Sequence, residues 1–364
     1  MVEYLKILWL SHRDIQSPNS GGAERTIYEI GRRLANSGHE ITWRSVKWKG
    51  ARANLELEKM KIIRAPTNII SHVLNPFTLR METPDVIVDD LGHAVPWGSE
   101  LFTKAKGTVF FRHLHKRSLP GQVSLPKRYT IETLESLYSK IYRSWPFVAE
   151  SNSSIEDLLE LGIEIERIQK IPPGVDTVKL KPSKKTDAPT IVYFGGYRAY
   201  KRPWEILYAF KEILKENRDA KLYMVGNGPV LDEVKYISNK LGYNKEVVFT
   251  GKLDEESLKQ IVAKAWVNVH TSVTEGFGYS ILEASALGTP TVAYEVNGVK
   301  DAIEYNKNGI LIKNNERSQL AYSINYEIFP FVEKWSKGSR NVSLKYSWDK
   351  SAFQWSEHLG KLVN

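Results

Sequence analysis

The chain contains no cysteine, and no apolar run approaches the roughly 18 residues that a membrane-spanning helix requires. The missing thiols exclude disulfides, thiolate catalysis and cysteine-ligated zinc. The N-terminus also lacks the charged and then apolar segments of a signal peptide, so we expect a cytoplasmic protein. No long block of Lys and Arg occurs, nor a zinc-finger or single-strand-binding signature, which argues against nucleic acid as the partner.

The charge balance indicates the class of partner, and the length indicates the number of domains. The sequence holds 51 Lys and Arg against 42 Asp and Glu, a net charge of +9, which favours anionic partners such as nucleotide phosphates or acidic lipid. A length of 364 residues exceeds the size at which one core usually stops growing, so two domains are expected. The apolar fraction of 42% can fill both cores.

Short apolar runs alternate with amphipathic stretches along the chain, the pattern of parallel strands joined by crossover helices. In the first half we predict the strand Tyr4–Leu10, the helix Ala23–Ser37 and two more strands at Asp85–Val88 and Thr108–Phe111. A helix over Thr130–Tyr142 follows. The fold class is therefore α/β, with doubly wound, Rossmann-like sheets.

The same alternation restarts after a polar, basic and proline-flanked segment, Lys179–Pro189, which has the composition of a linker. We therefore predict an acceptor-side domain over 1–178, a linker over 179–189 and a nucleotide-binding domain over 190–345, with a last helix over 346–364 that packs back on the first domain. In such sheets ligands sit at the carboxyl ends of strands. The predicted ligand loops are those after Leu10, Phe111, Phe194, Val225 and His270.

One of these loops, Thr274-Glu-Gly-Phe-Gly278, opens directly into a helix. Its glycines expose backbone N–H groups at the positive end of that helix, which suits phosphate. Glu275 lies in the loop and Glu283 about one turn into the helix, and carboxylates accept hydrogen bonds from the paired hydroxyls of sugars and ribose. The alternative is a tight turn with two solvated carboxylates.

Two more glycine loops favour the ligand interpretation. Phe194-Gly-Gly-Tyr-Arg-Ala-Tyr-Lys-Arg-Pro203 follows a strand and ends in Lys201 and Arg202, at the start of another helix. Two cations at such a turn suit a diphosphate, which Arg binds with two nitrogens and Lys as a point charge. Gly226-Asn-Gly-Pro229 closes the next strand.

With these loops in place, the sequence resembles the retaining glycosyltransferases of family 4 along nearly its whole length. Each matching fragment is weak alone, but six occur in the family's order. The fragments are Ser20-Gly-Gly-Ala-Glu-Arg25, Gly38-His-Glu-Ile-Thr42, Ile171-Pro-Pro-Gly-Val-Asp176, Gly226-Asn-Gly-Pro229, the Glu-x7-Glu motif Glu275–Glu283, and Ala284-Ser-Ala-Leu-Gly-Thr-Pro-Thr-Val292.

The resemblance implies a GT-B architecture, two Rossmann-like domains with an interdomain cleft. It also implies transfer of a sugar, with retention of anomeric configuration, from a nucleoside-diphosphate sugar to an acceptor hydroxyl on a glycan or a lipid-linked sugar. A UDP- or GDP-sugar is the favoured co-substrate, and neither a cofactor nor a metal is expected. The remaining alternatives are another GT-B activity, an epimerase or a phosphorylase, and a binder of nucleotide sugars without turnover.

Carried over residue by residue, the resemblance assigns a donor site. Glu283 would hold the ribose, Glu275 the hydroxyls of the donor sugar, and Lys201 the diphosphate. The segment Gly276, Phe277 and Gly278 would offer backbone amides. Gly21 and Gly22 would let the N-terminal loop approach the diphosphate closely.

The match is imperfect at two places in the second domain. Where family members often carry Arg, this chain has Gly196, which leaves Arg198 or Arg202 to replace the missing charge. The family's late Gly-Gly-x-x-Glu stretch is only partly kept, as Asn297-Gly-Val-Lys-Asp301.

The acceptor-side domain offers a smaller set of candidates. The family's His near the donor sugar corresponds to His113 or to His115, which face the same way on an extended segment, and His113 is favoured by strand length. Asp89-Asp90 follows a strand, and we favour a role without metal for it.

A membrane surface is a further candidate partner. Lys127–Trp145 mixes basic and aromatic residues in the manner of a helix that lies on an anionic membrane. A location on the inner face of the membrane is the corresponding expectation. The equally weighted alternative is an exposed helix with a core-facing aromatic stripe.

Overall fold

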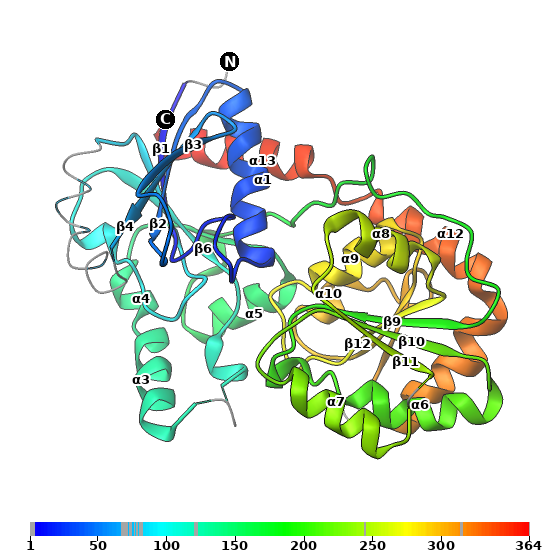
Figure 1. Ribbon diagram of the computed structural model, residues 1–364. Helices are drawn as coiled ribbons and strands as arrows, with labels where there is room; N and C mark the ends of the chain where they lie inside the picture. Colours follow the sequence, from blue (N-terminus) through cyan, green and yellow to red (C-terminus); the bar gives the residue numbers. More distant parts are fainter. Residues whose placement is uncertain are drawn as a thin grey trace. The chain divides into compact units, whose positions relative to one another are not determined.

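The computed structural model describes residues 4–66, 72, 75, 77, 79, 83–119, 123–243, 245–313 and 316–363. Its contacts divide the chain into two units, which we describe separately (Figure 1). The first unit consists of residues 1–174 with 348–364, and the second of residues 175–347. No helix in the described ranges is long and apolar enough to cross a membrane.

The first unit is built on an eight-stranded sheet in the order β3-β4-β2-β1-β5-β6-β7-β8. All neighbouring strands are parallel except β3 and β4, which pair antiparallel. The strands are β1 Lys6–Leu10, β2 Glu40–Val46, β3 Asn54–Leu57, β4 Met60–Ala65, β5 Val86–Asp90, β6 Lys106–Phe111, β7 Phe147–Ala149 and β8 Ile168–Lys170.

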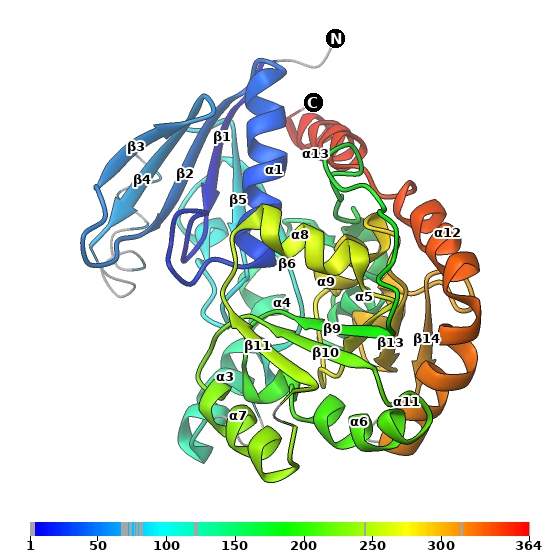
Figure 2. The same cartoon turned by 45° about the vertical axis from the view of Figure 1, so that its right-hand side comes forward.

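Helices cover both faces of this sheet. They are α1 Gly22–Asn36, α3 Leu125–Ser136, α4 Tyr138–Ile141, α5 Asn152–Glu160 and α13 Trp348–Val363, with 3-10 turns at Ser99–Leu101, His115–Arg117 and Ile165–Arg167. Although α1 and α13 come from opposite ends of the chain, they lie side by side (Figures 1 and 2). Trp355 of α13 is fully buried, with its ring centroid 4.9 Å from those of Trp9 and Phe110.

The antiparallel hairpin β3–β4 was not predicted. Its two-residue turn is Glu58-Lys59, and both residues have positive φ, 49° and 63°. Asn-Gly or Asp-Gly is the usual sequence for a turn of this kind, because those residues adopt positive φ most readily. The hairpin therefore forms without the usual sequence signal.

The segment predicted as one helix over Thr130–Tyr142 is two helices, α3 and α4, that meet at Leu137. Tyr138, Tyr142 and Trp145 are buried in the core of the first unit. The hydroxyl of Tyr138 donates to the carbonyl of Ala94 at 2.7 Å. These aromatic side chains therefore belong to the core.

The second unit has a six-stranded sheet in the order β11-β10-β9-β12-β13-β14, with all neighbours parallel. Its strands are β9 Thr190–Phe194, β10 Lys221–Val225, β11 Val247–Gly251, β12 Val267–His270, β13 Thr291–Tyr294 and β14 Gly309–Ile312. The helices are α6 Glu205–Glu216, α7 Leu231–Lys240, α8 Glu255–Lys264, α9 Tyr279–Ala286, α10 Val299–Ala302, α11 Arg317–Tyr322 and α12 Val332–Ser343. A 3-10 turn spans Ala199–Lys201, a π-helix spans Ser323–Ile328, and a second 3-10 turn spans Phe329–Phe331.

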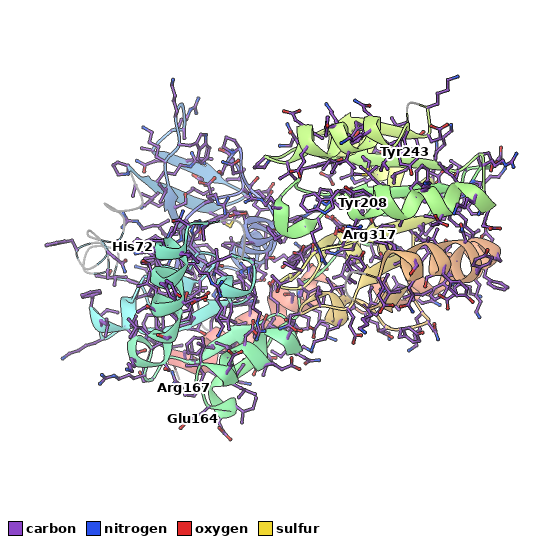
Figure 3. All side chains as sticks on the ribbon, turned by 90° about the horizontal axis from the view of Figure 1, so that it is seen from below. His72, Glu164, Arg167, Tyr208, Tyr243 and Arg317 are labelled. Carbon is purple, nitrogen blue, oxygen red and sulfur yellow. The ribbon has the colours of Figure 1, made fainter. Side chains whose placement is uncertain are left out.

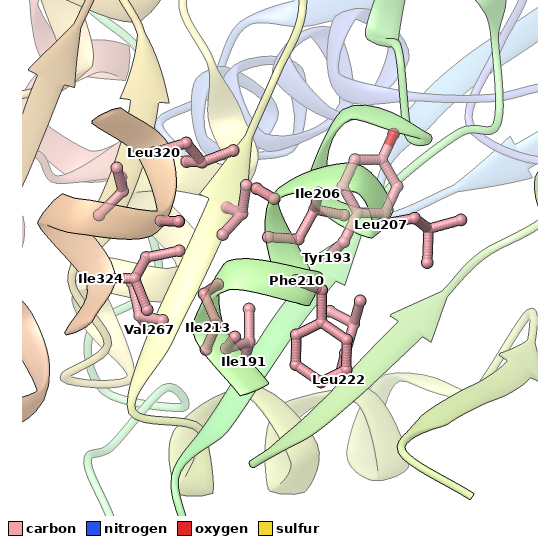
Figure 4. Packing of buried hydrophobic residues seen from close by; sticks show 14 of the residues in the cluster. Ile191, Tyr193, Ile206, Leu207, Phe210, Ile213, Leu222, Val267, Leu320 and Ile324 are labelled. Carbon is pink, nitrogen blue, oxygen red and sulfur yellow. The ribbon is translucent and has the colours of Figure 1, made fainter. Parts of the chain in front are cut away.

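Two cores fill the faces of the second sheet. On one face α6, α7 and α11 pack against the strands, and on the other α8 and α9 do so (Figure 2). Phe210 of α6 and Leu320 of α11 belong to the first core (Figure 4). Arg317 joins these two helices, because it binds both carboxylate oxygens of Glu205 and lies 4.3 Å from the ring centroid of Tyr208 (Figure 3).

The segment predicted as a linker is part of the second unit. Leu180 is buried in its core, and the Lys185 ammonium donates to the carbonyl of Ala263 at 3.0 Å and to the hydroxyl of Thr289 at 2.9 Å. Burial lowers the pKa of Lys185 to about 7. Leu180 and Lys185 therefore anchor this segment in the second unit, whereas residues 181–184 are exposed.

Each sheet contains one point where the strand order reverses. In the first unit it lies between β1 and β5, and in the second between β9 and β12. At such a point the loops leaving two neighbouring strands diverge, which opens a crevice at their carboxyl ends where ligands bind in this fold class. The candidate sites are therefore expected at these two places.

Candidate functional site

At the reversal point of the second sheet, an ion pair joins the loop after β9 to the loop after β12. The ammonium of Lys201 lies 2.6 Å from Oε1 of Glu275. Their side chains are 20% and 15% exposed, so the pair is largely buried but reachable. The hydroxyl of Ser272 donates to the same oxygen at 2.7 Å, and Nε2 of His270 lies 3.5 Å from it. Two residues predicted from separate loops thus form one polar cluster.

The electrostatics keep Glu275 ionised. Burial alone would raise the pKa of Glu275, but Lys201, His270 and the Ser272 hydroxyl outweigh it and hold the pKa at about 2. Burial likewise opposes the charge on Lys201, yet Glu275 raises the pKa of that ammonium. Burial lowers the pKa of His270 to about 4, so its imidazole is neutral at pH 7. The cluster therefore presents a carboxylate that accepts hydrogen bonds and an ammonium that donates them.

The two arginines of the β9 loop have different surroundings. Arg202 has left-handed backbone dihedrals, with φ of 44°. Its guanidinium donates to the carbonyl of Thr271 at 2.9 Å and lies 4.9 Å from the ring centroid of Tyr294. Arg198 is exposed, and its backbone N–H donates to the carbonyl of Gly196. Arg202 thus ties the two loops together, whereas Arg198 faces solvent.

Close backbone packing at the glycines fixes the shape of these loops. A Cβ on Gly226, where φ is 132°, would lie 2.0 Å from the carbonyl oxygen of Gly195, so the third glycine loop packs directly against the first. A Cβ on Gly298, where φ is 78°, would lie 2.1 Å from the carbonyl oxygen of Glu275. The backbone that carries Glu275 is held in place by this contact and by its N–H, which donates to the carbonyl of Asn297.

The segment after Glu275 enters α9 as predicted. Gly278 caps the helix with φ of 82°, and no side chain caps the first turn. Phe277 is buried against Tyr346, with ring centroids 5.7 Å apart. Gly276 and Glu283 are partly exposed. The phenyl ring of Phe277 therefore anchors the loop in the core, which leaves its backbone as the part that can meet a ligand.

In the first unit, Gly21 and Gly22 begin α1 at the loop after β1. The N–H of Gly21 donates to a carboxylate oxygen of Glu24 at 2.7 Å, and Arg13 lies 3.1 Å from the other oxygen of that carboxylate. A Cβ on Gly21 would meet nothing closer than the Glu24 carboxylate at 3.8 Å. Nothing in the described fold therefore requires glycine at position 21.

The reversal point of the first sheet holds a cluster that was not predicted from the sequence. His12 follows β1, and its Nε2 lies 3.1 Å from Nε2 of His72. The His93 ring lies 4.2 Å from that of His12, and the Trp97 ring stacks at 4.4 Å on that of His72. We call these four residues the histidine cluster. Only the rule that loops meet at the reversal point could have brought positions 12 and 93 together in advance.

The two histidines predicted after β6 are neighbours, with ring centroids 5.0 Å apart. His115 is held on both ring nitrogens: Nδ1 lies 3.2 Å from the buried carboxylate of Glu135, and Nε2 lies 3.4 Å from the carbonyl of Gly92. His113 is partly exposed. The contacts of His115 are therefore those of a structural residue, which leaves His113 as the candidate for ligand contact.

The acidic pair Asp89 and Asp90 is used within the fold. Asp89 accepts hydrogen bonds from the hydroxyls of Ser99 and Tyr142, at 2.6 and 2.9 Å. Asp90 pairs with Arg112 at 2.7 Å. Over the described ranges, no three His, Asp or Glu side chains are arranged to hold a metal ion.

Comparison with known proteins identifies both halves of the chain. Residues 20–179 match the family model described as Glycosyltransferase Family 4, and residues 175–328 match the one described as Glycosyl transferases group 1. An uncharacterized glycosyltransferase of Methanocaldococcus jannaschii is 31% identical over 169 residues, which cover 46% of this chain and 43% of that protein. A D-inositol 3-phosphate glycosyltransferase of Nocardia farcinica is 28% identical over 192 residues, 48% of this chain and 43% of that protein. The chain spans about half the length of the curated relatives it matches.

Solved structures share the fold over almost the whole chain. Sucrose-phosphate synthase from Thermosynechococcus elongatus has a TM-score of 0.84 at 18% identity, with 98% of both chains covered. Anabaena HepE in complex with UDP and glucose has a TM-score of 0.77 at 18% identity, with 99% of this chain and 100% of that one covered. The predicted fold class, GT-B with two Rossmann-like domains, is confirmed.

The ion pair between Lys201 and Glu275 gives a first prediction. A double-mutant cycle with Lys201→Met and Glu275→Gln should yield a coupling energy of about 1–3 kcal/mol at pH 7, because each single change leaves a largely buried group without its partner. Urea unfolding of the full chain measures this coupling energy. The control is the cycle on Lys215 and Glu212, which are also 2.6 Å apart but 59% and 49% exposed, and which should give less than ~0.5 kcal/mol. Equal coupling energies in both cycles would contradict the largely buried position of the pair between Lys201 and Glu275.

The buried neutral histidines give a second prediction, which concerns the free energy of unfolding at acidic pH. Burial lowers the pKa of His270 and His358 from 6.5 to about 4, and that of His12 to about 2. Between about pH 6.5 and pH 4 the unfolded chain binds protons that the folded chain does not, so the free energy of unfolding falls as the pH falls. His358→Gln should remove roughly 2 kcal/mol of the loss between pH 7 and pH 4.5. An unchanged pH profile for this variant would show that His358 is not buried in the neutral form.

Proposed function

Because this chain belongs to the group 1 glycosyltransferases of family 4, we propose that it transfers a sugar from a nucleoside-diphosphate sugar to an acceptor hydroxyl. The observation that supports this most strongly is the ion pair of Lys201 with Glu275, which joins two glycine loops at the strand reversal of the second sheet. There a cation for phosphate and a carboxylate for sugar hydroxyls stand side by side. We call this cluster, with the loops 195–202 and 271–278, the donor site.

In the donor site, Lys201 and Arg198 hold the diphosphate. The leaving nucleoside diphosphate gains negative charge as the bond to the sugar breaks, so cations already in place stabilise the transition state more than the ground state. Backbone amides of Gly276 and Gly278, near the start of α9, add partial positive charge. This arrangement supplies the electrostatic stabilisation through protein groups, and we propose that the reaction needs no metal.

The choice between the two arginines rests on their contacts. Arg202 is already engaged with the carbonyls of the β12 loop and with Tyr294, so its role is to position that loop. Arg198 is exposed on the same loop as Lys201. We therefore assign to Arg198 the charge that Gly196 does not provide.

The two glutamates recognise the hydroxyls of the donor. Glu275 remains a carboxylate throughout the physiological range, since its pKa is about 2, and can accept hydrogen bonds from the sugar. Glu283, on the exposed side of α9, would accept from the ribose. That a structural neighbour binds UDP and glucose on the same fold supports UDP-sugars as the first donors to test.

The acceptor is assigned to the first unit. We propose that His113 contacts the donor sugar as a neutral hydrogen-bond partner, and that the histidine cluster lines the approach of the acceptor. Retention would follow from attack on the same face that the diphosphate leaves, with the acceptor proton passing to the departing phosphate. The acceptor is a hydroxyl on a glycan or on a lipid-linked sugar.

A cytoplasmic, membrane-bound location remains part of the proposal, but residues 127–145 give it little support. Tyr138, Tyr142 and Trp145 lie in the core, and Arg128 pairs with Glu132 at 2.7 Å. Tyr129, the remaining aromatic residue of that segment, is 66% exposed. An ordinary exposed helix accounts for these contacts.

Turnover tests the proposed function directly. Purified chain is incubated with UDP- and GDP-sugars, with and without a mixture of glycan and lipid-linked acceptors, and the release of nucleoside diphosphate is measured. We expect release only with acceptor, and a loss of about 100-fold or more in kcat/KM for Glu275→Gln. Interconversion of nucleotide sugars without acceptor would indicate an epimerase, and cleavage that requires inorganic phosphate a phosphorylase. Binding of nucleotide with no turnover would leave only a binding protein.

The two arginines give a separable prediction. Arg198→Ala should weaken the affinity for nucleoside diphosphate by about 10-fold or more, with little change for the nucleoside alone, because one charge-assisted contact to phosphate is lost. The matched variant Arg202→Ala should lower the melting temperature, because it frees the β12 loop. Calorimetric titration and thermal unfolding measure the two effects. Full affinity in Arg198→Ala and full stability in Arg202→Ala would contradict the assignment, and weakened affinity in Arg202→Ala instead would reverse it.

A further inference from the structure

The second unit contains a pocket near the amino ends of its strands, whereas the donor site lies at their carboxyl ends. It has a volume of about 440 Å³ and lies between α12 and the turn that precedes β14. Gly309, the first residue of β14, pairs with Thr291, the first residue of β13, so the turn lies at the amino ends of the strands. The lining residues are Asn306, Lys307, Lys334, Trp335, Lys337, Gly338, Asn341, Val342 and Lys345.

The charge of this pocket is of one sign. Four lysines line it and no carboxylate does. Glu304, beside it, pairs with Lys307 at 3.0 Å and with Lys345 at 2.6 Å, which neutralises part of the charge. Across the described part of the chain, no carboxylate lies within ion-pair distance of the other two lysines, Lys334 and Lys337.

The backbone gives the pocket a defined form. Lys334, Lys337 and Asn341 follow one another at helical spacing along α12, so they share one face of that helix. Trp335 and Val342 are buried and form an apolar floor. A Cβ on Gly338 would lie 2.2 Å from the carbonyl oxygen of Lys307, so α12 approaches the turn as closely as a glycine permits. The lysines are therefore mounted on two elements held in close contact.

We propose that this pocket binds a phosphate group, carried either by a soluble phosphorylated molecule or by a lipid headgroup. Several lysine ammoniums around one cavity provide the point charges that a multivalent oxyanion requires. The volume falls in the range of about 300–1,000 Å³ typical of small-molecule sites. The apolar floor accommodates the part of the ligand that carries the phosphate. This site is distinct from the donor site and does not depend on it.

Calorimetric titration with inorganic pyrophosphate tests the soluble form. The full chain should bind two pyrophosphates. The double variant Lys334→Glu with Lys337→Glu removes one of them, and Arg198→Ala weakens the affinity for the other, at the donor site, by about 10-fold or more. Both lysines are exposed and, among the residues that the structure describes, have no ion-pair partner, so the melting temperature should not change. The control is Lys211→Glu with Lys235→Glu, two exposed lysines on α6 and α7, which changes the net charge equally.

Co-sedimentation with vesicles tests the headgroup form. Tyr305 and Leu344, next to pocket residues in the chain, are 58% and 56% exposed and can meet a membrane surface. If lipid is the source, the chain sediments with vesicles of phosphatidylglycerol and phosphatidylcholine but not of phosphatidylcholine alone, and pyrophosphate releases it. If the source is soluble, pyrophosphate binds the pocket and the vesicles do not.

The proposal is overturned if the pocket variant and its charge-matched control behave alike in both assays. It is also overturned if the chain binds a single pyrophosphate whose affinity only Arg198→Ala lowers. In that last case the donor site would stand and the pocket would be a solvated lysine surface. Conversely, if the full chain transfers no sugar but still binds pyrophosphate at the pocket, the proposed function is refuted and the pocket assignment stands.

Discussion

The ion pair of Lys201 with Glu275 is the constraint on which the donor site depends. It links loops that leave two neighbouring strands in opposite directions, at the one point of the second sheet where such loops can diverge. Holding two charges in a largely buried position is costly unless each is fully satisfied. The Ser272 hydroxyl donates to the Glu275 carboxylate, and His270 lies 3.5 Å from the same oxygen, so the carboxylate has partners beyond Lys201. The site is therefore organised before any ligand arrives.

Much of the second unit could be predicted from the sequence, because its strands and helices alternate with short loops. The loops predicted after Phe194, Val225 and His270 begin where β9, β10 and β12 end. In the first unit, the alternation of strands and helices predicted the elements less completely. The β3–β4 hairpin turns on Glu58-Lys59, which lacks glycine, and the chain direction changes at Leu137 without a proline or glycine to mark it.

The same contrast holds for the candidate sites. The rule that ligands bind at the carboxyl ends of strands placed the loops of Lys201 and Glu275 among the candidates, but their ion pair was not predicted. The distinct roles of Arg198 and Arg202 could not follow, since they depend on a left-handed backbone at one residue and on carbonyls supplied by another loop. The histidine cluster also escaped prediction, because its members come from positions 12, 72, 93 and 97.

We propose that the loops 195–202 and 271–278 form one nucleotide-binding site. Amide hydrogen exchange, measured with and without saturating nucleoside diphosphate, tests it most directly, because bound phosphate and sugar oxygens protect the backbone N–H groups they contact. We expect slower exchange in both loops, with Arg198→Ala reducing the protection in the first. Nucleotide binding that protects other segments and leaves these two loops unchanged would contradict it.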